Sequence, residues 1–370
     1  RYIENFSENT KISIKTPMVV QAGKKHFKCD FVDGVELEHF GGMGSAYSHW
    51  SKRLLNTEYM IADSYGENYI SNFTLSLLED SGWYKIDYTK SEDIPWGKNE
   101  GCNFLTEKCI RKKYVKNFED TFMSLDDNDN NSNVNKDTKN NTNTKKFRKH
   151  IFEPAFSNEF CTSHNVEECS ISHVFRGVCG VNKYKKDLPK PFQYFDDPKI
   201  SGLTDFGDYC PYTVEWYDSD KGIPIGSCRN GLQLRPEFGE QICENCRCFI
   251  SSLVSDELYR KEMKSVNKTY NNLDNNRAAC YEAKCKIENK KIRLIISLED
   301  KVIKCPKKGG ILTVEGYNGF IHCPKVESVC VGNLDPYLDF SKTSAYNLFA
   351  NISQKLLNII YDFVSSYFNR

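Results

Sequence analysis

The chain of 370 residues is long enough for two or three domains with hydrophobic cores of their own. Its fifty basic and fifty acidic side chains cancel, so no overall field draws the protein toward nucleic acid or an anionic membrane, and we expect no nucleic-acid partner. Sixteen cysteines, an even number in a loop-rich chain, predict a disulfide framework and therefore an oxidising compartment.

Other features also fit an extracellular protein. Six N-x-S/T sequons agree with secretion, and they lie at Asn5, Asn72, Asn130, Asn140, Asn267 and Asn351. No run of about 18 apolar residues is present that would span a bilayer. Because residue 1 is an arginine and no signal peptide precedes it, we expect a fragment or processed product of a longer protein that is secreted or bound to the cell surface.

Two helices are predicted in the first hundred residues. The segment 15–27 has Pro17 in a first turn and an apolar face at helical spacing. The residues of that face are Val20, Gly23 and Phe27. The segment 71–84 has Ser71 as a cap and Gly82 as a left-handed end, with an apolar stripe between them.

The density of cysteines changes near Cys102. Residues 1–100 contain one cysteine and residues 101–335 contain fifteen, which predicts a domain boundary at this point. We therefore expect one domain over residues 1–101 and a cysteine-rich domain over residues 102–340. The second domain contains short β-prone runs, which lie at 212–217, 291–299 and 311–317.

Two further segments differ in composition from the rest. Residues from about 122 to 148 include a run of Asn, Asp, Lys, Ser and Thr, which has too little apolar surface to fold and predicts a disordered insertion. Residues 341–370 repeat apolar side chains at helical spacing and predict an amphipathic helical tail. Such a tail suits docking on the protein's own surface, and it also suits contact with a lipid interface or a partner.

His49 lies in the string "VELEHFGGMGSAYSHW", after small residues that permit close backbone approach. Taken alone, a histidine in this setting is more often structural or solvent-exposed than a metal ligand. Two further strings change this interpretation, namely "LLNTEYM" and "LLEDSGWYKIDYTKSEDIPWGKNEGC".

Together these strings resemble the leishmanolysin family of zinc metalloproteases, which are secreted or surface-bound enzymes of the metzincin group. The resemblance runs from about residue 12 to about residue 335, apart from the Asn-rich insertion. It implies that His49 is the third protein ligand of a catalytic zinc. It also implies that "EYM" is the Met-turn, in which the side chain of Met60 underlies the metal without binding it.

A catalytic zinc takes three protein ligands and keeps a fourth position for water. In this family two histidines and a catalytic glutamate come from an H-E-x-x-H helix, and that motif is absent from these residues because no two of the seven histidines are four apart. Counting back from His49 by the family's spacing, we expect the motif about twenty residues before Arg1. One imidazole cannot hold catalytic zinc, so we predict that this polypeptide alone is inactive.

Two other groups of residues have the composition or spacing of a metal or redox site. Glu36, Glu38 and His39 form a cluster of ligand types, but a solvated acidic loop is the better interpretation. The spacing of Cys243 and Cys246 is that of a zinc or redox motif, yet a disulfide is favoured in a chain with so many other cysteines.

The resemblance also implies a disulfide pairing, which spacing alone cannot supply. The implied pairs are Cys29–Cys102, Cys109–Cys210, Cys161–Cys179, Cys169–Cys248, Cys228–Cys280, Cys285–Cys330 and Cys305–Cys323. Cys243 and Cys246 remain, either paired with each other or free. The bridge from Cys29 to Cys102 would fix the segment that carries His49.

The expected fold is α+β: the C-terminal part of a metzincin catalytic domain, mainly helices and loops, followed by a disulfide-rich domain that contains strands. The expected function, implied by the resemblance, is that of a zinc metalloendopeptidase with one Zn²⁺ per complete enzyme and protein or peptide substrates. Cell adhesion and association with the membrane or cell surface are further implications. The alternative is a secreted or surface binding module that keeps the protease scaffold without catalysis.

Overall fold

The computed structural model describes residues 11–63, 68–115, 149–163, 166–232, 234–259, 276–288, 291–299 and 301–330. It is a mixed structure of short helices and many strands, with eight disulfides. This agrees with the expectation of a disulfide-rich α+β protein. The predicted disordered insertion at about 122–148 and the predicted helical tail at 341–370 lie outside the described residues.

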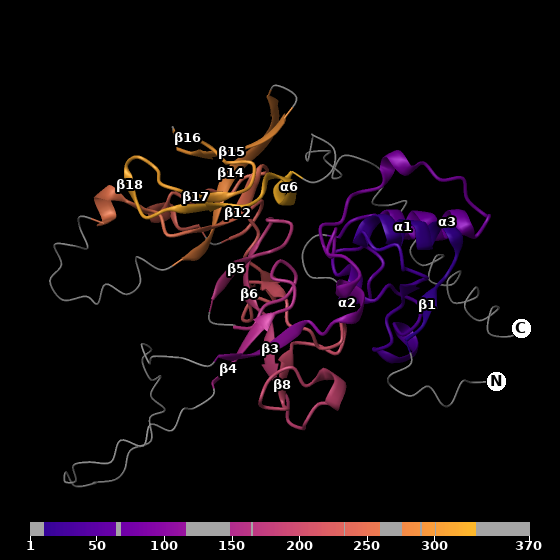
Figure 1. Cartoon of the computed structure of the whole chain (residues 1–370). Helices are drawn as coiled ribbons and strands as arrows, with labels where there is room; N and C mark the ends of the chain where they lie inside the picture. Colours follow the sequence, from indigo (N-terminus) through magenta and orange to yellow (C-terminus); the bar gives the residue numbers. More distant parts are fainter. Residues whose placement is uncertain are drawn as a thin grey trace, which may run out of the picture.

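Most of the helices lie in the first third of the chain, on one side of the molecule (Figure 1). The α-helices are α1 (Pro17–Phe27), α2 (Lys52–Leu55), α3 (Asn72–Asp80), α4 (Asn103–Thr106) and α6 (Val326–Val329). The 3-10 turns are η1 (Gly42–Gly44), η2 (Tyr88–Lys90), η3 (Lys190–Phe192) and η4 (Pro236–Phe238). No helix in the described part of the chain has the length and apolar character needed to cross a bilayer.

The strands are short except in the sheet formed by the last part of the chain. Those before residue 200 are β1 (Ser13–Ile14), β2 (Val35–Glu36), β3 (Ile110–Val115), β4 (Lys149–Pro154), β5 (Glu167–Cys169), β6 (Arg176–Cys179) and β7 (Val181–Lys183). They are followed by β8 (Ile200–Gly202), β9 (Thr213–Glu215), β10 (Tyr217–Asp218), β11 (Ile223–Pro224), β12 (Cys246–Ser251) and β13 (Val254–Ser255). The last are β14 (Arg277–Glu288), β15 (Lys291–Leu298), β16 (Lys301–Lys304), β17 (Gly310–Leu312), β18 (Tyr317–Asn318) and β19 (Ile321–Cys323).

Helix α1 forms where the sequence predicts it. Pro17 occupies the first turn, where its missing N–H costs no hydrogen bond, and the helix ends at Lys28 in the left-handed conformation. Its buried residues are Val19, Gly23 and Phe27. The expected face was therefore wrong by one position, because Val19 rather than Val20 faces the core.

Helix α3 packs against α1 and confirms the predicted cap. The Ser71 side chain accepts a hydrogen bond from the Phe73 N–H, and Gly82 adopts φ +72° just after the helix. At the other end, the Asp80 carboxylate accepts hydrogen bonds from the first N–H groups of α1. The end of α3 therefore helps to fix the start of α1, which is a scaffold role for Asp80.

The strands form one large antiparallel sheet and several small ones. The large sheet has the order β16-β15-β14-β12-β19-β17, and it lies on the opposite side of the molecule from α1 and α3 (Figure 1). A three-stranded sheet, β5-β6-β9, lies between these two parts (Figure 1). The β-prone runs predicted at 212–217 and 291–299 contain β9 and β15, whereas 311–317 contains only the ends of two short strands.

The buried apolar side chains form two main clusters. The first extends from Ile14 to Tyr212 and includes Phe73, Trp96 and Phe104. The second extends from Phe249 to Val326 and underlies the large sheet. A small third cluster consists mainly of cysteines of three disulfides and lies beside β12 and β14. The first core continues across Cys102, where the cysteine density changes.

Candidate functional site

A glycine-rich turn leads the chain to His49. The turn η1 follows Gly41, whose φ of +84° is a left-handed conformation that glycine adopts without strain. A Cβ atom at Gly41 would lie 2.6 Å from the Phe206 ring, so no larger residue fits here unless that ring moves. Close packing therefore requires glycine at Gly41, whereas a Cβ atom at Gly42 or Gly44 would meet nothing within 4 Å.

The His49 imidazole is half-buried and is oriented through its Nδ1 atom. Nδ1 lies 3.2 Å from the Ser45 carbonyl oxygen and 3.0 Å from the Ser48 hydroxyl. Because a carbonyl only accepts, we assign the proton to Nδ1, which leaves the lone pair on Nε2. Burial lowers the pKa of His49, although the Ser45 carbonyl opposes this shift. The neutral imidazole that a metal requires is therefore the favoured form near neutral pH.

Backbone hydrogen bonds place His49 and Trp50 between two other segments. The His49 carbonyl accepts from the Glu38 N–H at 2.8 Å, and the Trp50 N–H donates to the Met60 carbonyl at 3.0 Å. Trp50 forms an antiparallel bridge with Leu37 and a parallel bridge with Ile61. The residues predicted to be the zinc ligand and the Met-turn therefore lie on neighbouring stretches of backbone.

The Met60 side chain is buried, with 7% of its surface exposed. Its N–H donates to the carboxylate of Glu58, a residue that is itself fully buried. Met60 belongs to the first hydrophobic cluster together with Trp50 and Ile61. The "EYM" segment is thus a turn in which Glu58 and Met60 are buried and Tyr59 is exposed.

The acidic cluster before His49 has protein partners for its charges. Glu36 accepts from the Lys11 ammonium at 2.9 Å, and the His39 ring lies 3.5 Å from the Asp208 carboxylate. Burial lowers the pKa of His39, while the nearby Asp208 carboxylate raises it. Among the residues that the structure describes, no group of three or more His, Cys, Asp and Glu side chains is arranged to hold a metal ion.

Glu38 is buried and is not part of a solvated loop, so that expectation was wrong for this residue. Its carboxylate accepts hydrogen bonds from the N–H groups of His39, Phe40 and Lys52 at 3.0 to 3.2 Å. Burial raises the pKa of Glu38 to about 7. The carboxylate connects the start of the glycine-rich turn to the first residue of α2, and these segments flank His49 on both sides.

Eight disulfides join all sixteen cysteines. Seven of them are the pairs that the family resemblance implies. The eighth joins Cys243 to Cys246, which the sequence left open. The bridge between Cys29 and Cys102 connects the residue after the C-cap of α1 to the residue before α4, and so closes the part of the chain that contains His49.

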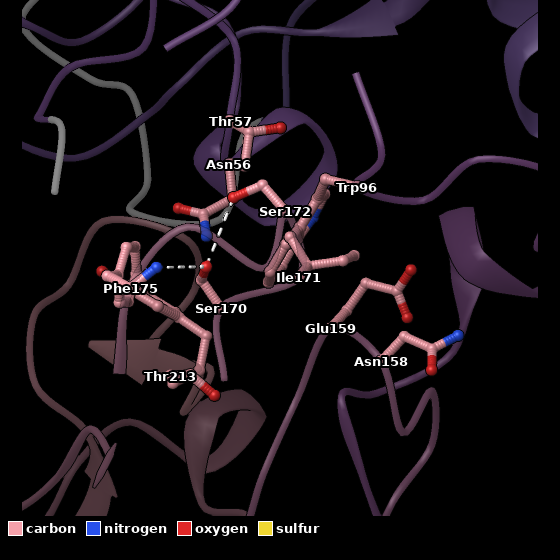
Figure 2. A pocket seen from close by; sticks show the side chains of 11 residues that line it. Asn56, Thr57, Trp96, Asn158, Glu159, Ser170, Ile171, Ser172, Phe175 and Thr213 are labelled. Carbon is pink, nitrogen blue, oxygen red and sulfur yellow. Dashed lines mark hydrogen bonds between the residues drawn. The ribbon is translucent and has the colours of Figure 1, made fainter. Parts of the chain in front are cut away.

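A small cavity lies between the first hydrophobic cluster and the β5-β6-β9 sheet (Figure 2). Its volume of about 20 Å³ suits a water molecule and is far too small for a peptide. The lining includes Thr57 and Glu159, each of which has a buried oxygen without a hydrogen-bond partner in the structure. Burial raises the pKa of Glu159 to about 7. His49 and Met60 do not line this cavity.

Sequence reasoning missed the buried carboxylates Glu58 and Glu159. Each is followed by an aromatic residue, but so are the half-buried Glu215 and the exposed Glu237. No signal in the sequence identifies them, since burial at these positions depends on contacts with distant segments.

Comparisons with known proteins agree with the resemblance. A family model described as leishmanolysin matches residues 2–336. A leishmanolysin homolog of Crithidia fasciculata is 28% identical over 333 residues, which cover 88% of this chain and 43% of the relative. Leishmanolysin of Leishmania tropica is 25% identical over 357 residues, covering 93% of this chain and 46% of the relative. A leishmanolysin-like peptidase of Drosophila pseudoobscura pseudoobscura is 27% identical over 340 residues, covering 85% and 43%. The chain therefore spans less than half the length of these relatives.

Proposed function

Because this chain belongs to the leishmanolysin family of metalloproteases, we propose that it supplies the third zinc ligand and the Met-turn of a zinc metalloendopeptidase. His49 is the proposed ligand and Met60 the proposed Met-turn residue. The observation that carries the proposal is the orientation of the His49 ring, whose Nδ1 atom lies within hydrogen-bond distance of the Ser45 carbonyl.

The chemistry of His49 fits zinc. A histidine that binds a metal usually donates its other ring N–H to a carbonyl or carboxylate, which fixes the tautomer and the direction of the lone pair. The Ser45 carbonyl does this for Nδ1, so Nε2 is the nitrogen that would bind. The lowered pKa of His49 reduces the competition between protons and metal at neutral pH.

The chain's own residues have distinct proposed roles. His49 completes the ligand set, and Met60 provides a buried apolar floor through its side chain. When bound, zinc would act as a Lewis acid and lower the pKa of its water to about 7. The substrates would be proteins or peptides, as in other peptidases of the family.

The proposed setting is outside the cell, either secreted or at the cell surface. Eight disulfides support this proposal because such frameworks persist in oxidising compartments. Adhesion and membrane association remain proposals from the resemblance alone.

The complete activity needs residues that these 370 do not include. The sequence contains no H-E-x-x-H, so neither the other two histidines nor the catalytic glutamate is present. We therefore expect the chain alone to bind zinc well below one equivalent and to show no cleavage of casein that a chelator abolishes. The same chain preceded by its encoded upstream segment should bind one zinc and cleave casein.

His49→Ala in the longer protein tests the proposed ligand. The loss of one of three ligands should reduce zinc content and casein cleavage by at least about tenfold, because metal affinity depends on the full ligand set. His322→Ala is the matched control, since His322 lies on β19 in the distant sheet. Zinc content and activity are measured on both. Full zinc binding by the His49 variant would overturn the proposal, and an upstream segment without H-E-x-x-H would favour a binding module instead.

A further inference from the structure

Glu58 carries a carboxylate in the centre of the first hydrophobic cluster, where a charge is costly. Its side chain has no exposed surface, and burial raises its pKa to about 7. A buried carboxylate is tolerated when hydrogen-bond donors surround it. The partners of Glu58 therefore indicate what this position does.

Hydrogen-bond donors from three residues converge on the Glu58 carboxylate. The Ser71 hydroxyl donates at 2.8 Å and the Thr74 hydroxyl at 2.5 Å, both to Oε1, and the Met60 N–H donates to Oε2. Ser71 is the N-cap of α3 and Thr74 lies in its first turn. Glu58 thus connects the turn that contains Met60 to the start of α3.

The directions of these hydrogen bonds are fixed by their neighbours. The Thr74 hydroxyl oxygen accepts from the Trp50 indole N–H at 2.9 Å, and the Ser71 oxygen accepts from the Phe73 N–H at 3.1 Å. Each hydroxyl therefore keeps its own proton for Glu58. The carboxylate oxygens accept these hydrogen bonds, which matches the acceptor-only character of an ionised side chain.

These contacts form a closed circuit around the candidate site. The Trp50 indole reaches Glu58 through Thr74, Glu58 binds the Met60 N–H, and the Met60 carbonyl accepts from the Trp50 N–H at 3.0 Å. Trp50 directly follows His49. A shift of Glu58 would therefore move the backbone on which both His49 and Met60 are carried.

We propose that Glu58 is a positioning residue that fixes the His49–Trp50 backbone relative to the Met60 turn through Thr74. The proposal rests on the proposed function in assigning these two residues to a metal site. It predicts that the carboxylate is needed for its acceptor capacity rather than its size. Glutamine has the same shape, but its NH₂ group would face one of these donors.

The test uses the 370-residue chain with selective isotope labels on histidine, tryptophan and methionine. In Glu58→Gln we expect shifted resonances of the Trp50 indole and the His49 ring, and amide hydrogen exchange at Met60 about tenfold faster or more than in the unchanged chain. The matched control is Glu92→Gln, because the Glu92 carboxylate accepts the Ile70 N–H next to the same helix start. That control should leave the His49 and Trp50 signals unchanged.

A second pair of variants keeps the test decisive if Glu58→Gln does not fold. Thr74→Ser retains the hydroxyl and should preserve the His49, Trp50 and Met60 signals, whereas Thr74→Val removes it and should alter them. All variants are made in a host that adds no N-linked glycan, because Thr74→Val also removes the sequon at Asn72.

The outcomes separate this inference from the proposed function. The positioning role would be overturned if the His49 signals were unaffected in both Thr74→Val and Thr74→Ser. It would also be overturned if Glu58→Gln and Glu92→Gln shifted the His49 signals equally. If instead His49→Ala leaves zinc binding intact in the longer protein, the metal site fails while the coupling between Glu58 and His49 stands.

Discussion

At the scale of single residues, His26 is a histidine whose surroundings decide its charge. Its Nε2 atom lies 2.8 Å from the Trp96 carbonyl, and its ring packs against Phe27 and Phe73. Burial lowers the pKa of His26 to about 4, although the Trp96 carbonyl opposes the shift. The folded protein therefore keeps this imidazole neutral over a range in which the unfolded chain would protonate it.

His26 should make the protein less stable as the pH falls from about 6.5 toward 4. In this window the unfolded chain binds a proton that the folded protein does not, so the contribution of His26 is complete above pH 6.5 and is lost below it. Urea unfolding of the chain and of His26→Gln at several pH values isolates this group. The stability difference between them should decrease by about 2 kcal/mol between pH 7.5 and pH 5. A difference that does not change with pH would show that His26 titrates normally in the folded protein.

The residues of the candidate site were predictable only in part. His49 and Met60 were found because the strings around them are specific, even though one histidine carries little information by itself. The structural roles of Glu58 and Glu38 were not predicted, since the neighbouring residues in the sequence do not indicate whether an acidic side chain is exposed or buried. Their donors come from other segments of the chain, such as Thr74 for Glu58 and Gly207 for Glu38, and local patterns do not reveal such contacts.

At the scale of elements, α1 depends on a side chain from α3. The Asp80 carboxylate accepts from the Met18 N–H at 3.0 Å and from the Val19 N–H at 3.1 Å, which are donors without partners inside the helix. Thr16 at the N-cap makes no side-chain hydrogen bond, so Asp80 takes over the capping role. Its negative charge also interacts favourably with the N-terminal end of the helix dipole.

Asp80→Ala should lower the free energy of unfolding by about 1 to 2 kcal/mol, the usual cost of losing a helix cap. Asp87→Ala is the control, because Asp87 caps the 3-10 turn η2 at an exposed position and its loss should cost clearly less than the loss of Asp80. Urea unfolding monitored by tryptophan fluorescence compares the two variants. Equal losses would mean that Asp80 does not stabilise α1 specifically.

The elements show which kinds of local signal are reliable. Pro17 and Ser71 predicted the helix starts correctly because a first-turn proline and a serine cap act within a few residues. The expected face of α1 was wrong by one residue, since Val19 and Val20 are alike and tertiary packing decides between them. The order of strands in the large sheet was not predictable, because β12 pairs with both β14 and β19 across long stretches of chain.

At the scale of the whole molecule, packing and cysteine density divide the chain differently. The first hydrophobic cluster includes Phe73 and Phe104 on either side of Cys102, and the second begins at Phe249. Between them, the buried ion pair of Arg176 with Glu240 at 2.9 Å and the disulfide Cys169–Cys248 join the β5-β6-β9 sheet to β12 and the segment before it. The boundary predicted near Cys102 remains a prediction about chain organisation, but the core shows that both sides of it pack together.

The disulfides should contribute to stability according to the length of chain that they close. Cys29–Cys102 has a sequence separation of 73 residues and Cys243–Cys246 one of 3. Chain entropy then predicts losses of about 4 kcal/mol for Cys29→Ser with Cys102→Ser, and about 2 kcal/mol for Cys243→Ser with Cys246→Ser. Urea unfolding measures both losses, and hydrogen exchange reports where the chain loosens. The first pair should also speed exchange around His49, because its bridge closes the part of the chain that holds this residue. If the two double variants lose the same stability, or if exchange around His49 does not change, the Cys29–Cys102 bridge does not support the candidate site.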